Sequence, residues 1–169
     1  MKWIVRLALM AAISISVAFV LAVIPHLESR KAGEPWTAQP ERTVLANDNL
    51  VDQIIRLPLR LDIKKVDWDN GILALDLALA AKNVAPSVVY QDLVTISYFG
   101  FAQTVNVNHI LVRVLGYDSG QAPNLLLALK ADRKQWEKDD FRSLAENRIS
   151  SEQFLRKNFQ LIATPRWKP

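Results

Sequence analysis

The sequence predicts an α+β protein, with an N-terminal transmembrane helix followed by a two-layer sandwich of a mainly antiparallel sheet packed with helices. Three observations lead to this fold class. Residues 7–24 carry no charged side chain. Stretches of alternating apolar and polar residues flank the turn sequence Asp69-Asn70-Gly71. Segments with helical periodicity lie between and after the strands, which gives the order ββαββαα along the chain.

The N-terminal anchor is predicted from its length and its flanks. Residues 7–24 form an uncharged run of 18 residues, close to the ~20 apolar residues that a helix needs to cross a bilayer. Pro25 ends this helix, and we expect residues 3–24 to contact membrane lipid. The alternative is a cleaved signal peptide with Lys2 and Arg6 as its basic region, although the apolar core of a signal peptide is typically ~7–15 residues.

The basic character of the chain is concentrated beside this anchor. The formal charge is +4, but from residue 32 onward 17 basic residues stand against 16 acidic ones. Cations beside a membrane segment meet anionic headgroups, so we predict no nucleic-acid partner. The short N-terminal tail with its free amine favours an extracytoplasmic domain on a single-pass protein of the cell membrane. Lys and Arg are balanced across the anchor, so charge alone leaves the topology open.

The chain is predicted to divide into an anchor at 1–27, a linker at 28–49 and a single α+β domain at 50–165. Pro35 and Pro40 lie in a stretch with few periodic apolar positions, which is typical of a semi-extended linker. The part of the chain beyond the anchor is long enough for one domain with its own core.

A β-hairpin with a bulge is predicted at the start of the domain. Apolar residues occupy odd positions from residue 57 to Ile63 and even positions from Val66 onward, and Pro58 suggests an edge strand. A β-bulge at Lys64–Lys65 restores one continuous apolar face, and Asn70-Gly71 is a strong hairpin turn signal. The expected pairs across the hairpin are Trp68–Leu73, Val66–Leu75, Ile63–Leu77 and Leu61–Leu79.

A helix and two strands are predicted next. Pro86 suits the first turn of a helix. Gly100 ends one helical face and permits a close approach to the sheet. Strands are expected at 109–115 and 124–130, because both runs are apolar and lie between turn residues. The expected helical face contains Val89, Leu93, Ile96 and Gly100, widened by Tyr90, Val94 and Phe101.

The C-terminal part is predicted as two helices. The first carries a stripe of apolar residues that includes Phe141 and Leu144. Ser150 begins the second and forms a capping box with Gln153. Helical spacing continues to Ile162, and the following Thr-Pro pair ends the helix.

The sequence carries no recognisable catalytic constellation, and no cofactor or metal is predicted. Phosphate loops, nucleophile elbows, zinc motifs and dinucleotide fingerprints are missing from a chain with five glycines and no cysteine. His109 is interpreted as structural. Arg133 and the charged residues that follow it are interpreted as a solvated helix face. The hairpin acids could hold a hard cation but more often shape the turn; they are Asp62, Asp67, Asp69 and Asp76. A composite hydrolase site of His109 and these acids is the third-ranked hypothesis.

Residues 66–116 resemble a known family. The hairpin Val66-Asp67-Trp68-Asp69-Asn70-Gly71-Ile72-Leu73-Ala74-Leu75-Asp76-Leu77 is followed by a helix with Thr95-Ile96-Ser97-Tyr98-Phe99 and by the strand His109-Ile110-Leu111-Val112-Arg113-Val114-Leu115-Gly116. This succession is similar to the GerM-type domain of spore-forming bacteria. The sequence departs from the family in Ala78-Leu79, where a small polar residue is usual, and in Ile96-Ser97, where the family has Leu-Thr.

The resemblance implies a membrane-anchored, extracytoplasmic protein that acts in sporulation or germination through protein–protein assembly. It supplies no catalytic residue. We therefore expect a non-enzymatic domain that binds a protein partner or self-associates at the cell envelope, with Arg60 and Asp62 at the exposed strand edge as first candidates. The alternative is a module that binds cell-wall glycan or a small ligand in a groove lined by exposed Trp or Tyr, with Trp36, Tyr98 or Tyr117 as candidates.

Overall fold

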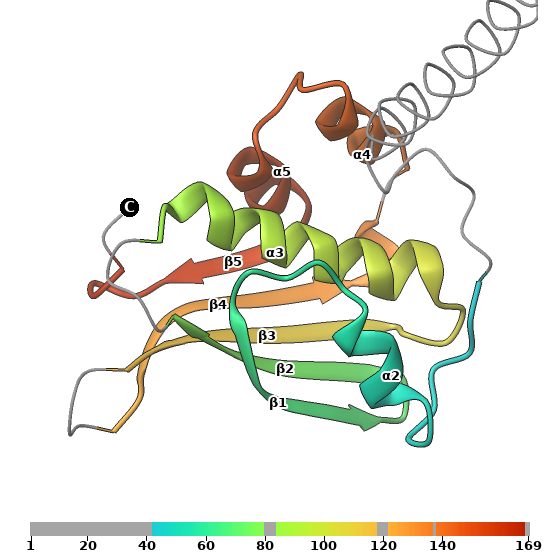
Figure 1. The fold of residues 1–169 in the computed structure, drawn as a ribbon. Coiled ribbons are helices and arrows are strands. Elements are labelled where there is room, and N and C mark those ends of the chain that lie inside the picture. Colours follow the sequence, from blue (N-terminus) through green and yellow to red (C-terminus); the bar gives the residue numbers. More distant parts are fainter. Residues whose placement is uncertain (1–41, 80–83, 118–121, 137, 168–169) are drawn as a thin grey trace, which may run out of the picture. The chain divides into compact units, whose positions relative to one another are not determined.

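The described strands and helices belong to one folded unit (Figure 1). The computed structural model describes residues 42–79, 84–117, 122–136 and 138–167. In chain order, the elements are α2 (Leu50–Ile55), β1 (Asp62–Asp69), β2 (Ile72–Leu79), α3 (Pro86–Tyr98), the π-helical turn η1 (Phe99–Gln103), β3 (His109–Gly116), β4 (Asn124–Asp132), the 3-10 turn η2 (Arg133–Gln135), α4 (Lys138–Ala145), α5 (Ser151–Asn158) and β5 (Gln160–Ala163).

The strands form one mixed sheet of five strands in the order β1-β2-β3-β4-β5. β2 and β3 run parallel, and the other three neighbouring pairs are antiparallel. The connection between the parallel strands passes through α3, as a crossover between parallel strands requires. The α+β class is therefore confirmed, with a fifth strand that was not predicted.

The core lies between one face of the sheet and the helices. Figure 1 shows α3 running across this face, and Val89, Leu93 and Ile96 on the inner side of α3 are fully buried. The predicted apolar face of this helix is correct, because its other members Tyr90, Val94 and Phe101 are buried as well. The sheet contributes Leu73, Leu75, Leu77, Ile110, Val112, Val114, Leu127, Leu129 and Ala131, each no more than 2% exposed.

The predicted hairpin and bulge are confirmed. Asn70 and Gly71 have φ angles of 45° and 85°, the left-handed backbone that an Asn-Gly hairpin turn needs. The register between β1 and β2 shifts between Ile63 and Lys65, which is the position predicted for the bulge. Three of the expected pairs form: Trp68–Leu73, Val66–Leu75 and Ile63–Leu77.

The start of this strand was predicted too early. β1 begins at Asp62, after α2 and an irregular segment at 56–61. In that segment, the backbone amides of Arg60 and Leu61 donate to the carboxylate of Asp92 on α3, at 2.9 and 2.8 Å. A side-chain acceptor thus takes the place of a neighbouring strand, so the alternation before Asp62 does not become part of the sheet.

The second C-terminal helix was predicted too long. α5 begins with the predicted capping box of Ser150 and Gln153, but it ends at Asn158. Residues Gln160–Ala163 form β5, which pairs antiparallel with β4. The outer edge of β4 offers backbone hydrogen bonds to this segment, and that tertiary contact overrides the helical spacing.

Arg133 was wrongly placed on a solvated helix face. Its guanidinium lies against η1 and donates to the carbonyl oxygens of Gly100, Phe101, Thr104 and Val107, at 2.6–3.0 Å. Carbonyls at a helix C-terminus lack intrahelical donors, and the planar guanidinium supplies them. Burial lowers the pKa of Arg133, and Arg42 lowers it further.

The described end of the predicted linker packs onto the domain. Thr43 forms a parallel bridge with Thr104, and Leu45 is 1% exposed. The Asn106 side chain accepts from the amide of Leu45 and donates to its carbonyl. The chain is therefore ordered on the domain before residue 50. The predicted anchor lies outside the described residues, among which no helix has the length and apolar character needed to span a membrane.

Candidate functional site

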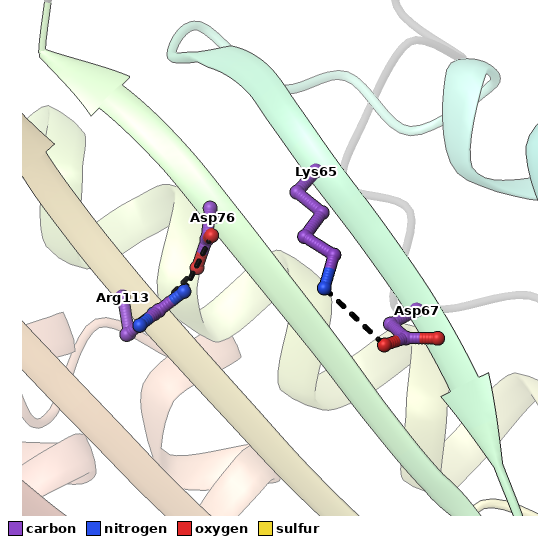
Figure 2. Close-up of polar contacts among 4 residues, drawn as sticks. All are labelled: Lys65, Asp67, Asp76 and Arg113. Atoms are coloured by element: carbon purple, nitrogen blue, oxygen red, sulfur yellow. Dashed lines mark hydrogen bonds and ion pairs between the residues drawn. The ribbon is translucent and has the colours of Figure 1, made fainter.

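The second face of the sheet is uncovered by the described helices. Figure 2 views β1, β2 and β3 from this side, with the helices behind the strands. The register places side chains from all five strands in adjacent rows on this face. We call it the open face; it contains Lys65, Asp67, Ala74, Asp76, Leu111, Arg113, Ala128, Lys130, Gln160 and Ile162, each of them exposed or half-buried.

Two ion pairs order the charges on this face (Figure 2). Asp76 on β2 and Arg113 on β3 are directly opposite in the parallel register. They form a bidentate pair, with Nε to Oδ1 at 2.7 Å and Nη2 to Oδ2 at 2.6 Å, and this hydrogen bonding raises the pKa of Arg113. Lys65 and Asp67, two residues apart on β1, make a looser pair at 3.4 Å.

The two pairs border a shallow hollow of ≈250 Å³ on the open face. Ala74 and Leu111 contribute apolar surface between them, and Leu111 is 38% exposed. The Asp76 side chain is only 14% exposed, whereas Arg113 is 59% exposed. A planar bidentate pair with one shielded carboxylate has a fixed geometry, so the guanidinium is presented in a defined orientation to whatever contacts this face.

The candidate binding residues do not share one site. Arg60 and Asp62 are both exposed near the start of the edge strand β1. Tyr98 is buried, 6% exposed, and stacks on Phe141 with ring centroids 4.6 Å apart. Tyr117 is 43% exposed beneath the ammonium of Lys64, and Trp36 lies outside the described residues.

Tyr98 and Tyr117 are also far apart along the sheet. Tyr98 lies two residues before Gly100, which packs against Ile110 near the start of β3. Tyr117 follows the end of that strand. At ~3.3 Å per strand residue, about 20 Å separates these two ends. A groove lined by both tyrosines is therefore not formed.

His109 has a partner that sequence reasoning missed. Its Nδ1 lies 3.3 Å from Oδ2 of Asp132, the residue opposite it on β4. Of the hairpin acids, Asp76 pairs with Arg113 and Asp67 pairs with Lys65. Within the described ranges, no group of three His, Cys, Asp or Glu side chains could hold a metal ion. Asp67 and Asp76 therefore contribute to ion pairs on the sheet surface.

Only one member of the Asp76–Arg113 pair could be predicted from the sequence. The alternation of the hairpin predicted that Asp76 points away from the core, which the structure confirms. Nothing local identified Arg113 as its partner, because the two residues lie 37 positions apart and meet only through a parallel register.

Comparisons of this chain with protein-family models, curated proteins and solved structures found no match. The resemblance to the GerM-type domain therefore remains a prediction from the residues. The function has to be argued from the sequence features and the geometry described above.

Proposed function

We propose that this protein is a non-enzymatic, membrane-anchored domain that mediates protein–protein assembly at the cell envelope through the open face of its sheet. The observation that carries the proposal is the exposed sheet surface, on which ordered ion pairs alternate with apolar side chains. The partner is a folded protein surface with charges of both signs, because the open face carries Arg113 on β3, Lys130 on β4 and Asp67 on β1.

The apolar side chains of the open face support a macromolecular contact. Leu111 is 38% exposed in the middle of the sheet, and Ile162 is 61% exposed on β5. Protein interfaces combine such an apolar centre with polar groups that fix orientation. The Asp76–Arg113 pair sits beside Leu111 and can set that orientation.

A small-ligand site is less well supported. Pockets for small ligands are typically ~300–1,000 Å³ and enclose most of the ligand. The hollow on the open face is ≈250 Å³, and its charged groups already satisfy one another. The burial of Tyr98 removes one of the three aromatic residues on which the glycan-binding alternative relied.

The location rests on the N-terminal sequence. The uncharged run at 7–24 supports a single-pass anchor. The resemblance of residues 66–116 to the GerM-type domain supports a role in sporulation or germination. A topology reporter fused after residue 169 tests the orientation, because export of the reporter is required by this proposal.

Site-specific photo-crosslinking in the native host tests the assembly role. A photo-reactive amino acid replaces Leu111 on the open face of the full-length chain, and in a matched control it replaces Val51 on α2, which is 59% exposed. We expect discrete adducts with envelope proteins from position 111 and not from position 51. Equal adduct patterns from the two positions, or none from position 111 in an exported and folded protein, would contradict the proposal.

A further inference from the structure

The two outer strands of the sheet differ in how their free edges are protected. β1 carries a bulge, two lysines and three aspartates, which are features that prevent edge-to-edge pairing. β5 has the sequence Gln160-Leu161-Ile162-Ala163, without a charge or a proline. Its register with β4 is unbroken, and Ile162 is 61% exposed. β5 is short, with four residues, but it lacks the charges and the bulge that protect β1.

The backbone of β5 presents unpaired hydrogen-bonding groups on its outer side. The amide of Thr164 donates to the carbonyl of Leu126 on β4, at 3.0 Å. In an antiparallel pair, successive residues point their amide and carbonyl groups to opposite sides. Ile162 therefore points these groups toward β4, while Leu161 and Ala163 point theirs away. Among the described elements, β5 pairs only with β4.

The surface beside β5 is hollowed. A hollow of ≈520 Å³ is lined by Phe159, Leu161 and Ile162 together with Arg156 and Gln160. The guanidinium of Arg156 is held by Glu152 one helical turn earlier, at 2.8 Å. Its charge is thus balanced within α5, and the groups along the edge itself are uncharged.

We propose that β5 pairs antiparallel with β5 of a second copy of this chain, which joins the two sheets across a two-fold axis. Leu161 aligns with the partner's Ala163 and exchanges both backbone hydrogen bonds with it, and the symmetric pair does the same. The edge is complementary to itself because both copies offer the same two outward residues. Ile162 meets the partner's Ile162 on the axis, so each covers the exposed side chain of the other.

This inference goes beyond the proposed partner contact, because it uses the edge of the sheet and a second copy of the chain. A hetero-partner that adds an extended strand to the same edge is the competing occupant. A second copy is favoured because an uncharged segment such as residues 160–163 pairs with itself without repulsion. The pairing then requires no group from outside this chain.

Disulfide trapping tests the geometry, since the chain contains no native cysteine. Ile162 and its symmetry mate form a non-hydrogen-bonded pair, in which Cα atoms lie about 4.5 Å apart, within the range a disulfide spans. The full-length chain with Ile162→Cys, purified in detergent micelles and mildly oxidised, should become a covalent dimer. The matched control, Val51→Cys, has a similar exposed fraction, 59% against 61%, and should remain monomeric.

A backbone variant tests the hydrogen bonds. Ala163→Pro removes an outward amide and leaves the ladder with β4 intact, so the protein should fold while dimerisation weakens ~10-fold or more, because each dimer loses two hydrogen bonds. Ala163→Ser keeps the amide and should dimerise like the wild type. Ile162→Lys is a second variant, which places two like charges on the axis. Sedimentation of the full chain measures each dimer fraction.

Several results would overturn the β5–β5 dimer. They are equal trapping of the Ile162→Cys and Val51→Cys chains, unchanged dimerisation of a folded Ala163→Pro or Ile162→Lys chain, or a wild type that sediments as a monomer at all concentrations. These results leave the adducts from position 111 unaffected. Conversely, the adducts from position 111 could be lost while disulfide trapping at position 162 persists. That result would contradict the proposed function and would still support the β5–β5 dimer.

Discussion

A β-carbon on Gly100 would lie 2.6 Å from the Cδ1 atom of Ile110 and 3.2 Å from Cγ1 atoms of Ile110 and Val107. Real Cβ atoms do not approach other atoms as closely as the shorter of these distances. The glycine in η1 is thus the point at which the end of the α3 segment descends onto β3. This contact positions the helical layer over the buried face of the sheet.

We expect Gly100→Ala to lower the free energy of unfolding by about 1–3 kcal/mol, because the added methyl group overpacks a filled site. Ile110→Val removes the Cδ1 atom that clashes first and by itself costs about 1 kcal/mol. The double variant should be more stable than the sum of the two single effects predicts. Urea unfolding of all four proteins gives the coupling energy. Simple additivity would show that the close approach is not what constrains position 100.

Arg133 should be far more sensitive to substitution than other arginines of this chain. In Arg133→Lys the charge is kept, but a lysine ammonium cannot donate to four carbonyls at once. We therefore expect the free energy of unfolding to fall by about 2–4 kcal/mol. Arg148 pairs with Glu146 on an exposed turn, and Arg148→Lys should change stability by less than about 0.5 kcal/mol. Thermal unfolding measures both. A similar small effect at position 133 would contradict the proposed capping role.

Asp92 makes stability depend on pH in a specific direction. Its burial raises the pKa of the carboxyl above 3.8, an effect opposed by the amides of Leu61 and Arg60. Both amides donate to Oδ2, so Oδ1 remains able to carry a proton. The folded state binds this proton more tightly than the unfolded chain does. Protonation of Asp92 therefore stabilises the folded state increasingly as the pH falls through the raised pKa toward 3.8. This contribution to stability is lost at neutral pH.

Substitutions at Asp92 check this sign. Asp92→Asn keeps an oxygen acceptor and does not titrate, so wild type should gain stability relative to the variant as the solution is acidified from neutral pH. Asp92→Ala leaves two backbone amides without their acceptor and should lower the free energy of unfolding by about 2 kcal/mol. Urea unfolding at neutral and mildly acidic pH measures the differences. A wild type that loses stability relative to the Asn variant on acidification would show that the pKa is lowered.

The Asp76–Arg113 pair should matter more for assembly than for folding. Exchange of the two residues, Asp76→Arg with Arg113→Asp, retains the pair and should change the free energy of unfolding by less than about 1 kcal/mol. The exchange reverses the charge order on the open face, and adducts from position 111 should fall by tenfold or more if one charged contact is worth about 1.4 kcal/mol. Unchanged adducts from the exchanged protein would place the contact elsewhere.

Local patterns in the sequence determined several parts of this structure. The Asn-Gly turn and the phase shift at residues 64–65 predicted the hairpin and its bulge. The spacing of apolar residues predicted the buried side of α3, and Ser150 predicted the start of α5. These features depend on contacts between residues close in the chain, where sterics and capping hydrogen bonds act without help from the rest of the fold.

Only the tertiary structure decided the remainder. Residues 160–163 have helical spacing, yet they form a strand because the edge of β4 supplies their hydrogen bonds. Nothing in the local sequence indicates the partners of Arg133 and Asp92. In the fold, Arg133 donates to backbone carbonyls and Asp92 accepts from backbone amides. The open face likewise depends on the parallel register that aligns Asp76 with Arg113. Such partners lie far apart in the sequence, and only the packed sheet determines which backbone and side-chain groups meet.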